Sequence, residues 1–159
     1  MFDRFGEFDS AEEINEAAKG LVREGDIDSL KVLCRENGID EDMMQAFLDG
    51  DIPFLTDAMS AALGKIEIES KELKPKELVE DWIEYIKAQC MEHEDIAIAV
   101  RKKGKNVKGC IVVLLRWSFK NRYDVDPEIA KAAGVNQKVQ MGIPGMGTAK
   151  KLILDYYRR

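Results

Sequence analysis

Three glycines, Gly25, Gly38 and Gly50, divide the first third of the chain into short segments with apolar residues at helical spacing. Ser10-Ala11-Glu12-Glu13 fits a capping box, in which a serine hydroxyl and a glutamate carboxylate satisfy reciprocal backbone donors. The apolar positions that follow are Ile14, Ala17, Ala18 and Leu21. A chain interrupted at such intervals is expected to fold into short helices joined by turns.

Further helix starts follow the first one. Asp28 is predicted to cap a second helix, and Asp40 a third, in which Ile39 and Met44 form a hydrophobic staple. Thr56-Asp57 opens a fourth helix through Leu63. These segments form a predicted acidic helical lobe, residues 1–64.

A charged stretch then interrupts the helical periodicity. Lys65-Ile66-Glu67-Ile68-Glu69 alternates like a strand, but no second strand of similar strength exists, so the prediction is an extended connector. Pro75 suits the first position of a following helix. Residues 65–75 are therefore the predicted linker, and residues 76–159 the predicted basic helical lobe.

Helical patterns return after the linker. A helix of about four turns is expected from Lys76, and a shorter one from Glu94-Asp95. The run Cys110–Leu115 suits a buried strand or a central helix, and helix is preferred because its surroundings are helical. Asp126-Pro127-Glu128 is a strong helix start, and a Gly-rich loop, Gly142–Gly147, precedes the last helix. The predicted fold is an all-α bundle of about eight mostly short helices, in one body or two lobes.

Charge is divided between the two halves of the chain. Residues 1–99 hold 26 Asp/Glu and 10 Lys/Arg, and residues 101–159 hold 4 Asp/Glu and 14 Lys/Arg. The balances of −16 and +10 are hidden in the total of −6. Such a division indicates charged partners, one half packed on the other, or two solvated surfaces.

Composition points to a reducing compartment. The cysteines Cys34, Cys90 and Cys110 are odd in number and widely spaced, which favours buried thiols over disulfides. The longest strictly apolar run has six residues, too short for a membrane span, and Met1–Phe8 lacks the basic and apolar regions of a secretory signal. A cytoplasmic protein with no membrane partner is expected.

Catalytic and metal motifs find little support. His93 is the only histidine, so neither HExxH nor a two-histidine metal site can form. Pairing His93 with Cys90 or Cys110 would allow nucleophilic catalysis, but burial is the commoner fate of such cysteines. Walker and GxSxG motifs are absent. The prediction is a non-enzyme with no catalytic residue, metal or cofactor.

The densest basic patch spans residues 101–108. Its five cations are Arg101, Lys102, Lys103, Lys105 and Lys108. Such a turn can bind DNA or RNA phosphates with salt-sensitive affinity, it can be a solvated loop, or it can pair with the acidic lobe.

The Gly-rich segment Met141–Lys151 is a second candidate for phosphate binding. Amides near Gly145 and Gly147, reinforced by Lys150 and Lys151, would form an anion site at a helix N-terminus. The segment resembles the helix-hairpin-helix motif of DNA-binding proteins, although Gly147 runs straight into Thr148-Ala149 without the motif's usual two intervening residues. A tight turn before a packed helix explains the glycines equally well.

Acidic residues of the first lobe suggest a protein partner. The candidate contact residues are Asp26, Asp28, Asp40, Glu41 and Asp42. Their carboxylates can imitate phosphates in a nucleic-acid channel, or they can serve as helix caps.

The C-terminal half resembles the PcfK-like family. The resemblance lies in Trp82–Ile86, Val100, Gly104–Cys110, the apolar helix that follows and the closing Tyr156-Tyr157. Small helical proteins of that family occur on conjugative elements and prophages, and the whole chain also resembles small proteins of clostridial mobile elements. Some family members are anti-CRISPR inhibitors of the type II RNA-guided nuclease, and these act by binding.

The resemblance implies occupancy of a nuclease surface as the mechanism, with the RNA-guided CRISPR effector nuclease as partner. Two other functions stay open: a phage or plasmid DNA-binding accessory protein, and a structural or assembly protein. The methionines are compatible with a homodimer face or with core packing. They include Met43, Met44, Met59, Met141 and Met146.

Overall fold

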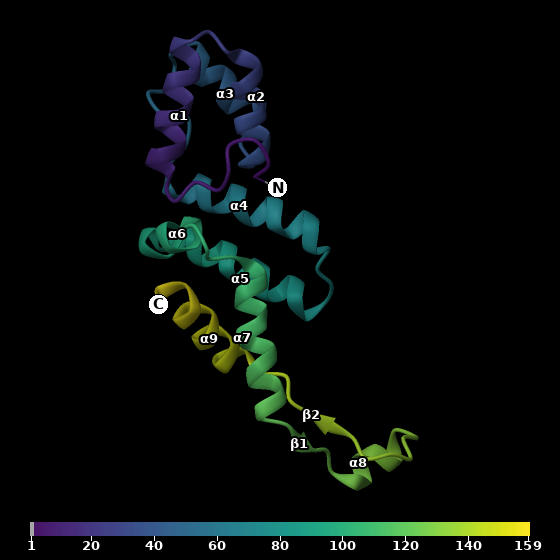
Figure 1. Ribbon diagram of the computed structural model, residues 1–159. Helices are drawn as coiled ribbons and strands as arrows, with labels where there is room; N and C mark the ends of the chain where they lie inside the picture. The colour runs from purple at the N-terminus through teal and green to yellow at the C-terminus, as the bar shows by residue number, and fades with distance from the viewer. Residues whose placement is uncertain (1) are drawn as a thin grey trace. The chain divides into compact units, whose positions relative to one another are not determined.

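The computed structural model describes residues 2–159, which are mostly helical (Figure 1). Within these residues the only sheet is a two-stranded ribbon, so the predicted all-α class is confirmed. The chain divides into two compact units. Unit 1 contains the residues up to Val107 together with Arg158, and unit 2 contains Lys108–Tyr157 together with Arg159.

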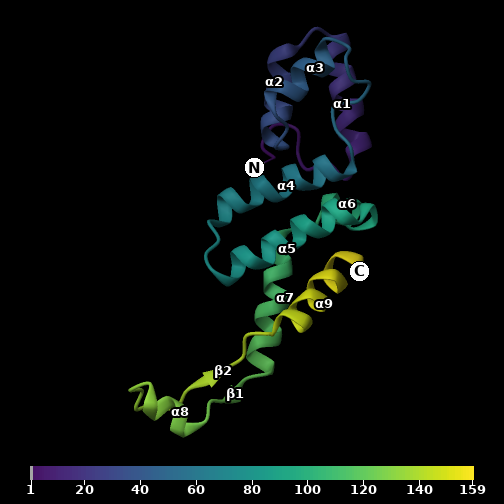
Figure 2. The same ribbon diagram turned by 180° about the vertical axis from the view of Figure 1, so that it is seen from behind.

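Unit 1 is built from six helices among its described residues. They are α1 (Ala11–Arg23), α2 (Ile27–Glu36), α3 (Glu41–Leu48), α4 (Ala58–Leu73), α5 (Leu78–Glu92) and α6 (Glu94–Arg101). The first three pack in sequence order, α1 on α2 and α2 on α3, as the two opposite views show (Figures 1 and 2). Helix α4 packs against both α5 and α6.

Caps define the helix starts of unit 1. The Ser10 hydroxyl accepts the Glu13 N–H at 3.2 Å, while the Glu13 carboxylate accepts the Asp9 N–H at 2.7 Å. The predicted start of α1 at Ser10 is therefore confirmed. The second cap was placed wrongly, because Asp26 rather than Asp28 begins α2 and accepts the Ser29 N–H at 3.0 Å.

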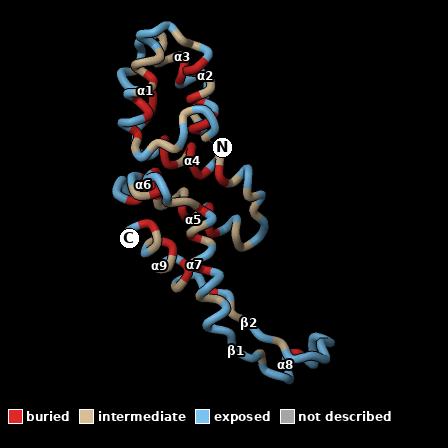
Figure 3. Tube along the Cα trace, viewed as in Figure 1, coloured by how far each residue is buried: buried red, intermediate tan, exposed pale blue. Residues whose placement is uncertain are grey.

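Apolar side chains of α1–α3 form a continuous core. Ile14, Leu30, Leu33 and Leu55 are fully buried, and Met44 is 5% exposed, so core packing accounts for this methionine. Ile14, Leu30, Leu33 and Met44 belong to α1, α2 and α3, whereas Leu55 belongs to the segment between α3 and α4. The buried stretches of these helices are red in Figure 3. The helical spacing of apolar residues thus produces the packing it predicts.

Two glycines let the α2–α3 turn approach α4 closely. Gly38 has a φ of +65°, and a Cβ on it would lie 2.5 Å from the Gly64 carbonyl oxygen. A Cβ on Gly64 would lie 2.2 Å from the Asn37 carbonyl oxygen. Since both obstacles are backbone atoms, neither position has room for a larger residue.

The extended connector predicted at Lys65–Glu69 is wrong. These residues continue α4, which runs unbroken to Leu73, so residues 65–75 do not form a linker. The contact boundary lies instead after Val107. Pro75 lies three positions before the first residue of α5 rather than at its start.

Unit 2 combines helices with a short ribbon. Its elements are α7 (Val107–Lys120, whose first residue belongs to unit 1), β1 (Tyr123–Asp124), α8 (Pro127–Ala132), β2 (Gln140–Met141) and α9 (Met146–Arg158). The helix prediction for Cys110–Leu115 and the Asp126 cap are confirmed. The antiparallel pairing of Tyr123 with Met141 was not predicted.

Candidate interaction surfaces

The five predicted acidic contact residues fall into two separate groups. Asp26 and Asp28 lie at the start of α2, whereas Asp40, Glu41 and Asp42 lie at the start of α3. The ten residues of α2 stand between the two starts. A helix of that length spans about 15 Å, so the five carboxylates do not form one cluster.

Asp26 serves a structural role within its group. Its carboxylate accepts the Ser29 hydroxyl at 2.6 Å as well as the Ser29 N–H. These hydrogen bonds hold the pKa of the Asp26 carboxyl below its usual value. Asp40, by contrast, is the N-cap of α3 but makes no side-chain capping hydrogen bond. Asp40, Glu41 and Asp42 are all exposed.

The α3 group belongs to a wider acidic surface. Residues 36–64 contain seven Asp/Glu and no Lys/Arg. Six of the seven are exposed, and we call these six the acidic face: Asp40, Glu41, Asp42, Asp49, Asp51 and Asp57. A cavity of about 410 Å³ opens beside Asp40 and is lined in part by the apolar side chains of Met43 and Leu63. Carboxylates therefore border an apolar hollow.

A buried ionic cluster joins distant parts of unit 1. Lys65 and Arg101 are each 1% exposed. The Lys65 ammonium donates to the Glu7 carboxylate at 2.7 Å and to the Lys102 carbonyl at 2.9 Å, and it also donates to the Lys105 carbonyl. One buried cation thereby fixes the N-terminal segment and the turn after α6.

Arg101 completes the same cluster. Its Nε donates to the Phe8 carbonyl at 3.2 Å, its Nη2 donates to Asn37 at 3.1 Å, and its guanidinium lies 5.3 Å from the centre of the Phe2 ring. The Nη1 atom has no hydrogen-bond partner among residues 2–159. The prediction that Arg101 contributes to an exposed phosphate-binding patch is wrong, because this side chain lies in the interior.

Glu69 is the buried anion of the cluster, whereas Glu7 is half-buried. Its carboxylate accepts the Val107 N–H at 2.6 Å and lies 4.0 Å from the Lys65 ammonium. Burial raises the pKa of Glu69 and lowers the pKa values of Lys65 and Arg101, because each loses hydration of its charged form. Mutual attraction and hydrogen bonding oppose these costs. The cluster was missed because Lys65 and Glu69 were predicted to lie in an extended connector and Arg101 in a basic turn.

Hydrogen bonds from other parts of unit 1 hold the backbone of the basic turn. Besides the two carbonyls bound by Lys65, the Lys103 N–H donates to Asp9 at 2.8 Å. Lys102, Lys103 and Lys108 are exposed, and Lys105 is half-buried. The turn is thus anchored through its main chain while three lysine side chains face solvent.

The Gly-rich segment leads into the N-terminus of α9 as predicted, but the helix already begins at Met146, so Gly147 lies in its first turn and not in the loop. Gly145 caps α9 with a φ of −61°, and a Cβ on Gly145 or Gly147 would meet no atom within 4 Å. Neither glycine is required by the backbone, whereas Gly142 is, since a Cβ there would lie 2.3 Å from the Ser118 carbonyl oxygen. Lys150 and Lys151 are exposed on the first turns of α9.

The three cysteines are buried in apolar surroundings. Burial raises the pKa of Cys34 to about 11 and the pKa values of Cys90 and Cys110 to about 12. Nucleophilic catalysis needs a thiolate, which this environment disfavours. His93 lies exposed between α5 and α6. Within residues 2–159 no three His, Cys, Asp or Glu side chains gather as a metal site.

No family model, no curated protein and no solved structure matches the chain. Among the helices of residues 2–159, none has the length and apolar character that crossing a membrane requires.

Proposed function

We propose that this protein is a non-enzymatic anti-CRISPR protein that binds the RNA-guided DNA nuclease of type II CRISPR systems and occupies its nucleic-acid-binding surface. The proposal combines the sequence resemblance to PcfK-like inhibitors with the acidic face. The observation that carries it is the run of residues 36–64, which presents six exposed carboxylates and contains no Lys/Arg.

The physical argument is one of complementary charge. Nucleases of this class hold an RNA–DNA heteroduplex in a positively charged channel. Carboxylates on a rigid helical surface can meet the cations that otherwise contact phosphates. The hollow lined by Met43 and Leu63 suits the aliphatic part of a lysine or arginine whose charged end reaches Asp40. Occupancy by the acidic face would then exclude nucleic acid.

The test is a pulldown and a DNA-cleavage assay with a type II RNA-guided nuclease at low and high salt. Binding with blocked cleavage is expected, and raising the salt should weaken both. The triple variant D40N/E41Q/D42N should lose at least about tenfold in affinity, because it removes three adjacent exposed carboxylates.

A matched control distinguishes the acidic face from general acidity. The variant E77Q/E80Q/D81N removes three exposed carboxylates near the start of α5 and should inhibit like the wild type. Equal inhibition by D40N/E41Q/D42N and the wild type would contradict the role of this face. Full cleavage in the presence of saturating wild-type protein would contradict the proposed function itself.

A second candidate function, DNA binding by an accessory protein, is favoured by one observation. The exposed Lys102 and Lys103 side chains project from a turn whose backbone is anchored by Lys65. Duplex DNA binding that weakens steeply with salt, and is lost in K102E/K103E, would support it. K71E/K74E, with two exposed lysines near the end of α4, is the matched control.

A further inference from the structure

Helix α7 has two apolar faces, and one of them is exposed. Its buried face carries Cys110 and Leu114. Val112, Leu115 and Phe119 are 42%, 54% and 61% exposed, respectively. Their spacing of three and four residues places them in one stripe along the helix. An outward stripe of this kind contributes nothing evident to the core.

The stripe continues onto the neighbouring ribbon. Phe119 and Arg122 line a hollow of about 140 Å³ together with Ile143, which is 65% exposed. The close approach of Gly142 to Ser118 brings this part of the chain against α7. Tyr123 lies opposite Met141 in the ribbon, with its hydroxyl 3.7 Å from the methionine sulfur. We call the six exposed residues the α7 patch: Val112, Leu115, Phe119, Tyr123, Met141 and Ile143.

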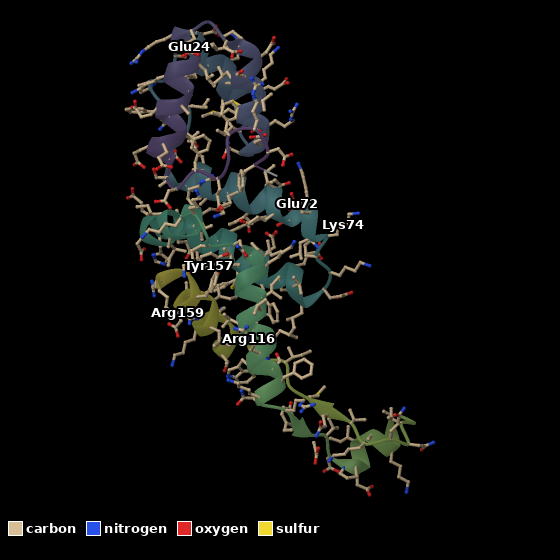
Figure 4. The ribbon with its side chains drawn as sticks, viewed as in Figure 1. Glu24, Glu72, Lys74, Arg116, Tyr157 and Arg159 are labelled. Atoms are coloured by element: carbon tan, nitrogen blue, oxygen red, sulfur yellow. The ribbon has the colours of Figure 1, made fainter. Side chains whose placement is uncertain are left out.

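The border of the α7 patch is cationic. Four exposed cations flank it, namely Lys108, Arg116 (labelled in Figure 4), Lys120 and Arg122. Residues 108–123 contain four Lys/Arg and no Asp/Glu. The next carboxylate along the chain, Asp124, accepts from Gln140 at 2.9 Å and lies 3.5 Å from Lys138. The four cations on this stretch therefore give the stripe a positive border.

The positive charge beside the α7 patch and its composition distinguish between three possible binding partners, namely a second copy of the chain, a nucleic acid and an acidic helix. Two copies of the chain joined through α7 would bring like charges together, which opposes a symmetric dimer. Base stacking requires aromatic faces, but four of the six patch residues are aliphatic or methionine. A stripe with residues at i, i+3 and i+7 instead matches the contact surface of a second helix, and a cationic border matches carboxylates beside that helix's apolar face.

We propose that the α7 patch is a docking surface for an amphipathic helix of a partner protein whose apolar face is bordered by Asp and Glu. Phe119, Leu115 and Ile143 receive the apolar side chains, while Arg116 and Lys120 pair with the bordering carboxylates. This surface is separate from the acidic face and does not depend on the proposed inhibitor function.

The probe is a stapled, fluorescein-labelled helix of about 16 residues, with leucines at the stripe spacing and glutamates beside them. Fluorescence anisotropy should show saturable binding below about 100 µM. The variant L115S/F119S should weaken binding at least about tenfold, and so should R116E/K120E. M91S, which changes a side chain 60% exposed on α5, should bind like the wild type. A peptide with lysines replacing the glutamates should bind at least about tenfold more weakly.

Each alternative binding partner of the α7 patch predicts a different experimental result. Absence of acidic-peptide binding at about 100 µM would overturn the proposal. Binding of labelled oligothymidylate or anionic lipid vesicles that is lost in L115S/F119S would reassign the patch to nucleic acid or membrane. Self-association lost in the same variant would reassign it to a second copy. Circular dichroism spectra must match between variants and wild type, and the cleavage assay reports separately on the acidic face.

Discussion

Lys65 and Glu7 lie fifty-eight positions apart in the sequence, and their charged groups meet at 2.7 Å inside unit 1. Lys65 occupies the middle of α4, whereas Glu7 belongs to the segment that precedes α1. Through the same ammonium, α4 also binds the carbonyls of the turn after α6. The Lys65 side chain therefore connects α4, the segment before α1 and the turn after α6.

Replacing Lys65 with methionine should destabilise unit 1 by about 3–5 kcal/mol, because it leaves Glu69 and two carbonyls without their cation. Urea unfolding followed by circular dichroism measures the change. Lys71→Met, at an exposed position on the same helix, should change stability by less than about 0.5 kcal/mol. Equal stability of the two variants would show that the cluster is not a stabilising element.

Alanine should change stability in opposite directions at two glycines, at Gly64, which contacts Gly38, and at Gly20, which has open space around it. Gly64→Ala should destabilise by about 1–3 kcal/mol, since its Cβ would lie 2.2 Å from a backbone oxygen. Gly20→Ala in α1 meets no atom within 4 Å and should stabilise by up to about 1 kcal/mol through helix propensity. Thermal unfolding of both variants checks the pair. A Gly64→Ala protein as stable as wild type would contradict the close approach.

The cap at Asp26 predicts an acid dependence of stability. Because folding lowers the pKa of this carboxyl, its contribution is fully present above the unfolded value near pH 4 and is lost as pH falls through the folded value. Asp26→Asn keeps a capping oxygen but removes the titration, so stability should fall less steeply below about pH 4. Urea midpoints measured across the acid range test this. A slope in Asp26→Asn as steep as in the wild type would contradict the role of this cap.

The buried thiols predict slow alkylation of the native protein. With pKa values of about 11 to 12, against 9.0 as the ordinary value, the thiolate fraction falls at least about 100-fold. Iodoacetamide at mildly alkaline pH should therefore label native protein at least about 100-fold more slowly than protein in urea. Mass spectrometry of the labelled peptides resolves the three sites. Rapid labelling of native Cys90 would show that α5 opens readily.

Local signals were sufficient to predict most helices. The starts of α1 and α8 could be predicted from Ser10 and Asp126, because a capping side chain binds backbone N–H groups only two or three positions away. The helix preference at Cys110–Leu115 also followed from neighbouring segments and is confirmed. The ribbon of Tyr123–Asp124 with Gln140–Met141 escaped prediction because two residues per strand are too few to show alternation.

One assumption produced the main errors. The pattern Lys65-Ile66-Glu67-Ile68-Glu69 looks like a strand only if its charged residues face solvent, but Lys65 and Glu69 are buried on the inner face of α4. Arg101 was assigned to a surface patch for the same reason. Their partners, Glu7, Asn37 and the Phe8 carbonyl, lie far away in sequence, so no local pattern could reveal them.

The anchoring of residues 2–9 has a consequence for synthesis on the ribosome. Glu7 and Phe8 leave the exit tunnel long before Lys65 and Arg101, their partners 58 and 93 positions later. At translation rates of about 5–20 residues per second, this delay lasts about 3–19 seconds. During that interval α1 and α2 can already form, and the backbone of Arg4 can bind Glu36 of α2, but Glu7 and Phe8 still lack their cationic partners. The leading segment is thus fixed in two steps, first on α2 and later on α4 and α6.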